Sequence, residues 1–149
     1  MSPAGFALDA LRPGDYAAWR VLAQAYKTFY ETSLPEEAYQ QTWQRILRGE
    51  GVFAWCVRAQ GQLLGIAHYV FHTNVWSAEV CYLQDLFVLE SARGQGVAQA
   101  LIEKVAQSAR ERGAPKLYWL THQTNARARR LYDRVARDHG FIRYDYSLG

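Results

Sequence analysis

The sequence predicts an α/β fold in which a mixed central sheet is flanked by helices. Segments with apolar residues at helical spacings of three and four alternate with short runs rich in β-branched and aromatic residues. In order, they indicate a strand, two helices, three strands, a helix, a strand, a helix and a closing strand. No Ser/Gly/Pro-rich linker and no internal repeat interrupts residues 1–149, so we expect a single domain.

Two helices are expected early in the chain. After a short strand at 6–11, Asp15 is a plausible cap for the first helix. Ser33 followed by Glu36 has the spacing of a capping box, which predicts that a second helix begins here and runs to about Leu47. The first helix presents one apolar face, made of Trp19, Leu22, Ala23, Tyr26, Phe29 and Tyr30.

The remaining elements are predicted from the same patterns. Strands at 52–58 and 63–72 form a hairpin through a turn at 59–62, and a polar loop at Thr73-Asn74 leads to a longer strand at 79–88. A strong helix, a short buried strand, a last helix and a closing strand follow at 94–112, 116–121, 125–137 and 140–146.

The composition excludes several classes of protein. Hydrophobic residues make up 50% of the chain, which excludes a disordered protein. The 17 Lys and Arg exceed the 14 Asp and Glu by only three, without the long basic run that indicates nucleic-acid binding, although this charge suits a small anionic ligand. No signal-peptide pattern and no apolar stretch of membrane-spanning length is present, so we expect a cytoplasmic protein without a membrane partner.

Cys56 and Cys81 are the only cysteines. Neither lies in a CxxC motif, and no Cys/His cluster has the spacing of metal ligands, so we expect no metal site. We interpret both as buried, reduced thiols, with a disulfide between them as the less favoured alternative.

A buried strand, a loop with two glycines and a long helix follow one another in the middle of the chain. The loop Arg93-Gly94-Gln95-Gly96 opens the helix at Val97 and Ala98. The first N–H groups of a helix and its dipole favour an anion, and glycine lets the backbone approach a phosphate closely. A P-loop is excluded because Val97 follows Gly96 where Lys is required, and a dinucleotide-binding loop would need a small residue at the same position.

Two motifs resemble those of the GNAT acetyltransferase superfamily. The R/Q-x-x-G-x-G/A signature is matched on the required strand, loop and helix by Val88, Arg93, Gly96 and Ala98. A later N-x-x-A-x-x-L-Y block is matched by Asn125, Ala128, Leu131 and Tyr132, and Gly140-Phe141 resembles the closing G-F. The segments 81–88 and 118–121 further resemble the polyamine, histone and D-amino-acid acetyltransferase branch.

The resemblance implies the GNAT fold and acetyl-CoA as co-substrate. It implies that the pantetheine arm pairs with the backbone of Leu86, Phe87 and Val88. The pyrophosphate is expected on the N–H groups of the loop and first helical turn, at Arg93, Gly94, Gln95, Gly96, Val97 and Ala98. Asn125 is expected to touch the pantetheine arm, and Arg134, from an otherwise solvated basic stripe, to reach a phosphate of the coenzyme.

The resemblance also implies catalytic roles. Tyr132 is expected near the thioester sulfur, where its hydroxyl protonates the departing thiolate, although its position also suits a core tyrosine. A backbone N–H near Val88 is expected to polarise the acyl carbonyl. Removal of the amine proton is assigned to Asp85 or to a water held by Gln84, with the water favoured because an amide is a poor base; Glu79 and His122 are alternatives.

The expected function is transfer of acetyl from acetyl-CoA to a primary amine. A small acceptor such as a polyamine or an amino acid is favoured over the lysine or N-terminus of a protein. A non-catalytic domain that binds or senses acyl-CoA is the alternative from another class. The closing strand, 141–146, has an edge that could pair across a homodimer.

Overall fold

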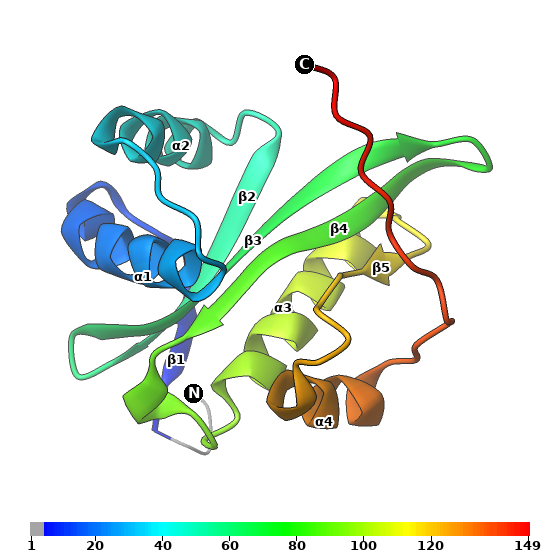
Figure 1. The fold of residues 1–149 in the computed structure, drawn as a ribbon. Coiled ribbons are helices and arrows are strands. Elements are labelled where there is room, and N and C mark those ends of the chain that lie inside the picture. The colour runs from blue at the N-terminus through cyan, green and yellow to red at the C-terminus, as the bar shows by residue number, and fades with distance from the viewer. Residues whose placement is uncertain (1–4) are drawn as a thin grey trace. The chain divides into compact units, whose positions relative to one another are not determined.

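The computed structural model describes residues 5–149, which contacts divide into two compact units. The first unit ends at Trp119, and the second is Leu120–Gly149. The first unit contains a five-stranded sheet with the strand order β1-β2-β3-β4-β5 and the helices α1, α2 and α3 (Figure 1). Among the described residues, no helix has the length and apolar character needed to cross a bilayer.

The sheet is mixed, as the sequence predicts. Its first four strands pair antiparallel, whereas β5 runs parallel to β4, because α3 carries the chain back to the same edge. The β3–β4 hairpin turns at Val75-Trp76 instead of Thr73-Asn74, because pairing continues to Asn74 and Ser77. The strands are β1 (Ala7–Asp9), β2 (Val52–Ala59), β3 (Gln62–Asn74), β4 (Ser77–Val88) and β5 (Leu117–Tyr118).

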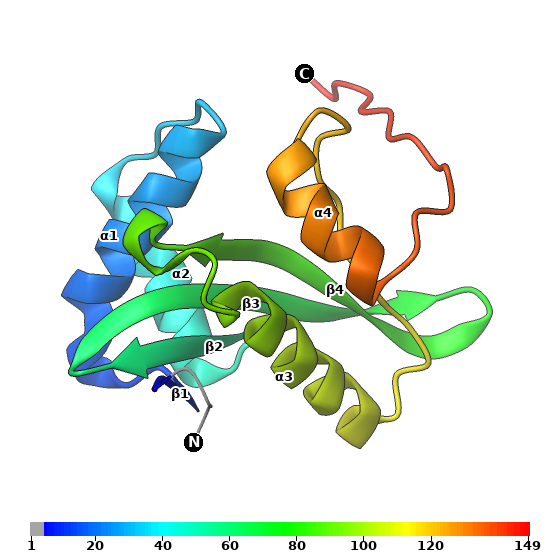
Figure 2. The ribbon, with the colours of Figure 1, turned by 90° about the horizontal axis from the view of Figure 1, so that it is seen from below.

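Helices cover both faces of this sheet. The pair α1 (Tyr16–Phe29) and α2 (Glu36–Arg48) lies on one face, and α3 (Val97–Arg112) lies on the other (Figures 1 and 2). Under α1 and α2, apolar side chains form one buried cluster of Trp19, Leu22, Ala23, Tyr39, Trp43, Cys56, Leu63 and Ile66. The predicted apolar face of α1 is therefore confirmed at its first turns, whereas Phe29 is 55% exposed.

The opposite face is closed by the apolar side of α3. Its Val97, Leu101 and Val105 are buried, as the helical spacing predicts. Gly65 of β3 makes this packing possible, since a Cβ there would stand 3.0 Å from Val97 Cγ1 and 3.0 Å from the carbonyl oxygen of Phe87. The missing side chain thus sets how closely the start of α3 approaches the sheet.

The side-chain capping bonds expected at the starts of α1 and α2 are absent, and ion pairs explain why. Asp15 occupies the N-cap position of α1, as predicted, but its side chain makes no capping bond to this helix, because its carboxylate pairs with Arg58 of β2 at 2.5 Å and accepts from the N–H of Arg12. Ser33 lies outside α2, which begins at Glu36 after Pro35. The Glu36 carboxylate accepts instead from Arg20 at 2.9 Å.

The end of the chain departs most from the prediction. The helix expected at 94–112 begins only at Val97, and the strand expected at 116–121 shortens to β5. In the second unit the last helix is α4 (Ala126–Val135). The strand predicted at 140–146 is wrong: its alternating apolar residues suit a strand, but no described strand pairs with it and Phe141 is 91% exposed. The expected dimer contact through that edge loses its basis.

Both cysteines are free and buried, as predicted. Burial raises the pKa of each thiol to about 11, so they are thiols rather than thiolates near neutral pH.

The glycine of β3 provides a stability test. Gly65→Ala forces a Cβ into the contact with α3, and overpacking of this kind is expected to lower the free energy of unfolding by about 1–3 kcal/mol. Gly14→Ala is the matched control, since no heavy atom lies within 4 Å of its added Cβ and its φ is not positive. Chemical denaturation measures both; equal stabilities of the two variants would contradict the assigned role of Gly65.

Candidate functional site

An extra residue in β4 defines the site. His68 of β3 pairs with Asp85, and the next pair joins Tyr69 to Leu83, so Gln84 has no partner across the ladder. This is a β-bulge, which changes the phase of a strand with respect to its two faces. Leu83 lies opposite Tyr69, which shares the face of β3 that Gly65 presents to α3, whereas Asp85 faces α1 and α2. Because of the bulge, two successive residues, Gln84 and Asp85, line the same cavity.

That cavity has a volume of about 300 Å³ and lies between α1, α2 and the sheet. Its walls are aromatic and aliphatic, with a few polar groups, which is typical of sites for small molecules. Its ionisable and hydrogen-bonding side chains come from α1 (Tyr26 and Lys27), α2 (Tyr39, Thr42 and Arg45), β3 (His68) and β4 (Gln84 and Asp85).

Asp85 is held by a chain of two hydrogen bonds. Its Oδ2 lies 2.9 Å from Nδ1 of His68, and Nε2 of His68 lies 2.9 Å from the indole Nε1 of Trp19. Burial acts to raise the pKa of Asp85, but the hydrogen bond from His68 and the charge of Lys27 outweigh it and hold the pKa below its usual value. Asp85 is therefore a carboxylate near neutral pH.

Tyr26 closes the same end of the cavity. Its hydroxyl donates to the carbonyl oxygen of Gln84, the bulged residue, at 3.4 Å. Burial, and then the nearby charge of Asp85, raise the pKa of Tyr26, so its hydroxyl stays protonated. The negative charge of this end of the cavity thus rests on Asp85.

Beyond β4, the chain makes the predicted glycine turn. A short 3₁₀ turn (Glu90–Ala92) ends at Arg93, whose side-chain Nε donates to the carbonyl of Val88 at 3.4 Å. Gly94 and Gly96 have φ values of 81° and 84°, a left-handed conformation that favours glycine. No heavy atom lies within 4 Å of a Cβ built on either glycine. The turn is thus open beside the N-terminus of the 16-residue helix α3.

The β4 edge next to this turn lacks a strand partner. In residues 5–149, β4 pairs with β5 only at Cys81 and Tyr82, so the pairing ends before Leu86, Phe87 and Val88. On its other edge, β4 remains paired with β3 as far as Val88. The backbone groups along the open edge are available to an extended ligand, as in strand addition.

Some of the predicted site residues form structural interactions. Asn125 caps α4: its Oδ1 accepts from the N–H of Ala128 at 3.4 Å, and its Nδ2 donates to Thr121 at 3.3 Å. Tyr132 and Arg134 lie on the same helix, Tyr132 half-buried and Arg134 exposed. Glu79 is no base for this cavity, because its carboxylate forms a two-point ion pair with Arg112 of α3, on the other face of the sheet.

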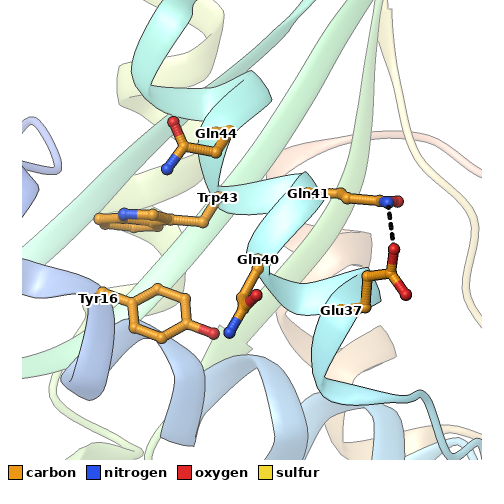
Figure 3. A pocket seen from close by; sticks show the side chains of 6 residues that line it. All are labelled: Tyr16, Glu37, Gln40, Gln41, Trp43 and Gln44. Carbon is orange, nitrogen blue, oxygen red and sulfur yellow. Dashed lines mark hydrogen bonds between the residues drawn. The ribbon is translucent and has the colours of Figure 1, made fainter.

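A second hollow, of about 560 Å³, is lined by side chains of α2 and by Tyr16 of α1 (Figure 3). Tyr16 and Trp43 form its apolar wall, and Gln41 donates to Glu37 at 3.2 Å across its rim. Three glutamine amides and one paired carboxylate offer little chemistry for group transfer. The cavity at Asp85 is therefore the stronger candidate.

Sequence reasoning missed His68, Trp19, Lys27 and Arg45. Trp19 was assigned to the core, which is correct, since it is 1% exposed. Its second task, the bond to His68, joins residues 49 positions apart. His68 alternates with apolar neighbours in a strand, and this pattern alone does not show which group the imidazole meets.

Comparisons with known proteins agree with this geometry. The sequence model of the acetyltransferase (GNAT) family matches residues 19–141. A D-amino-acid N-acetyltransferase of Saccharomyces cerevisiae is 39% identical over 134 residues, covering 87% of this chain and 83% of the yeast protein. A thialysine N-ε-acetyltransferase of Mus musculus is 30% identical over 123 residues, covering 76% of this chain and 70% of the mouse protein.

The fold is shared with solved structures at lower sequence identity. The aminoglycoside N-acetyltransferase AAC(6')-Iy in complex with CoA aligns with a TM-score of 0.85 and 20% identity over 100% of both chains. A complex of AAC(6')-Iy with a CoA bisubstrate analogue aligns with a TM-score of 0.86 and 19% identity over 97% of this chain and 99% of the other.

Proposed function

We propose that this chain, which belongs to the GNAT family of acetyltransferases, acetylates the amino group of a small amino acid. It is an N-acetyltransferase that takes the acetyl group from acetyl-CoA, whose thioester supplies the reactive acyl carbon. The observation that carries the choice of acceptor is the charge pattern of the cavity, where the carboxylate of Asp85 shares the walls with the cations Lys27 and Arg45.

This pattern fits a zwitterion. An ammonium group next to Asp85 and a carboxylate next to Lys27 or Arg45 would each meet the opposite charge. A polyamine would bring several positive charges to walls that carry one carboxylate and two cations, so we disfavour it. The names of the yeast and mouse relatives, a D-amino-acid and a thialysine acetyltransferase, support the same choice.

Asp85 binds and orients the amine in this proposal. A carboxylate whose pKa lies below its usual value is a weak base toward an ammonium group, so direct removal of the proton by Asp85 is unfavourable. Its charge does stabilise the positive nitrogen that forms as the amine attacks the acyl carbon. The bound ammonium gives one proton to water at the bulge, beside the exposed Gln84, and its lone pair can then attack. The positive nitrogen of the adduct loses a second proton to water as the C–S bond breaks and the thiolate of CoA leaves.

The residues around the turn fit the co-substrate. The open edge of β4 at Leu86, Phe87 and Val88 can pair with the amides of a pantetheine arm. The N–H groups of the turn and of the first turn of α3 can bind its pyrophosphate, and the space beside both glycines leaves room for it. We keep this segment, Arg93 to Ala98, as the proposed binding site.

The acceptor can be tested by a screen. The purified protein is incubated with acetyl-CoA and amino acids of both configurations, thialysine, spermidine and a lysine peptide, and CoA release is followed. We expect the highest kcat/KM with an amino acid, and about a tenfold rise in its KM in Arg45→Gln or Lys27→Gln, because each variant loses a charge-assisted contact. Arg110→Gln on α3 is the control. A preference for spermidine or for the peptide would exclude the amino-acid acceptor.

A pair of glycines on α3 tests the phosphate site. Gly96→Ala and Gly113→Ala place the same side chain at nearly the same φ, 84° and 83°, at opposite ends of one helix and in open space. Both should lose similar stability, by about 1 kcal/mol. Only Gly96→Ala should weaken binding of CoA, by about tenfold, as measured by calorimetry. Equal CoA affinity in both variants would place the pyrophosphate elsewhere.

We assign the acid role to Tyr132 on the basis of the family motif. Tyr132→Phe should lower kcat by about a hundredfold while the affinity for acetyl-CoA is retained, because only the hydroxyl that protonates the thiolate is lost. Tyr144→Phe, at an exposed tyrosine of the same unit, is the control. Unchanged kcat in Tyr132→Phe would rule out this role.

A further inference from the structure

The hydrogen bonds around His68 fix its tautomer. An indole N–H can only donate, so Nε2 of His68, 2.9 Å from Trp19 Nε1, must carry the lone pair. A neutral imidazole has its one proton on the other nitrogen, and Nδ1–H therefore donates to Asp85 Oδ2 at 2.9 Å. The direction of every bond in the chain Trp19–His68–Asp85 follows from the one group that cannot accept.

Packing prevents this chain from relaxing. Trp19 is 1% exposed, and its ring lies 5.1 Å from the ring of Trp43 and 6.4 Å from that of Tyr39, both on α2. The side chains of His68 and Asp85 are 12% and 20% exposed. Protonation of His68 at Nε2 would place two N–H groups face to face in a buried site, so the indole disfavours the imidazolium form.

We propose that Trp19 and His68 are positioning residues for Asp85: the indole holds His68 as the neutral Nδ1–H tautomer, whose single N–H keeps the carboxylate charged and aimed at the acceptor amine. This inference rests on the proposed role of Asp85. A protonated His68 would form an ion pair with Asp85 and offset the charge meant for the substrate ammonium. By keeping His68 neutral, the indole of Trp19 leaves the charge of Asp85 available to the substrate ammonium.

Five other titratable side chains line the cavity that His68 faces. Tyr26 and Lys27 of α1, Tyr39 and Arg45 of α2, and Asp85 of β4 line the same cavity. Asp85 is the only carboxylate among these lining residues, so an imidazolium at His68 would form its ion pair with Asp85.

The first test reads the tautomer directly. Imidazole nitrogen NMR shifts of the wild-type protein should show His68 as the neutral Nδ1–H form from about pH 8 to about pH 5.5. In Trp19→Phe, which keeps an aromatic ring in the core, Nε2 of His68 loses its hydrogen-bond donor, so the Nε2–H tautomer and the imidazolium form should appear in the same pH range. Titration of His68 in the wild type, or the Nε2–H tautomer, would overturn the proposal, and this readout requires no turnover.

The second test reads the consequence for catalysis. The ratio of kcat/KM in Trp19→Phe to that in the wild type should be constant above about pH 7.5 and fall about tenfold toward pH 5.5, because the amine titrates alike in both proteins and cancels. Trp55→Phe is the matched control: its indole donates to Ser108 at 2.9 Å on the other face of the sheet, and its ratio should not depend on pH. A flat ratio in Trp19→Phe would contradict the proposal.

Substitutions of His68 separate positioning from folding. Asn can present an N–H close to where Nδ1 lies, so His68→Asn should keep about tenfold more kcat/KM for the amine than His68→Ala, with the same KM for acetyl-CoA. Equal loss in both variants would indicate that the imidazole only fills space. A wild-type protein that turns over no amine would overturn the proposed function, whereas an active wild type with a titrating His68 would overturn this inference alone.

Discussion

The site depends on one extra residue in a strand. Gln84 interrupts the β3–β4 ladder, and the phase change that it causes turns Asp85 from the face covered by α3 to the face covered by α1 and α2. Without the bulge, strict alternation would direct Asp85 toward the buried apolar side of α3, where an unpaired carboxylate is costly. With the bulge, the carboxylate meets His68 across the strand pair.

Core and site share their residues on that face. Trp19 is at the centre of the aromatic cluster that joins α1 to α2, and it also donates the hydrogen bond that orients His68. The packing that stabilises the layer therefore also limits the rotamers of the groups around the cavity. On the opposite face, Gly65 lets α3 approach closely, and this places the start of α3 beside the open end of β4. Both faces of the sheet thus contribute to the geometry at its edge.

The chemistry assigned to the cavity follows from the balance of charges in it. Asp85 is kept ionised by hydrogen bonding and by Lys27 despite its burial, so it acts as a fixed charge rather than as a proton store. Tyr26 remains a neutral hydroxyl tied to the bulge. A site of this kind stabilises a positive nitrogen and leaves proton transfer to water, as the amide at position 84 suggested.

The sequence by itself determined the features that depend on neighbouring residues. Helical spacing located the apolar face of α3, and the glycines at 94 and 96 indicated the turn before it, since a positive φ is a local requirement. The family motifs identified acetyl-CoA as the donor of the acetyl group. Strand-like alternation at 140–146 misled, because a strand also needs a partner that no local pattern specifies. Only the tertiary structure decided which face Asp85 occupies and that His68 and Trp19 hold it, because strand register and a bulge are set by pairing between segments far apart in the chain.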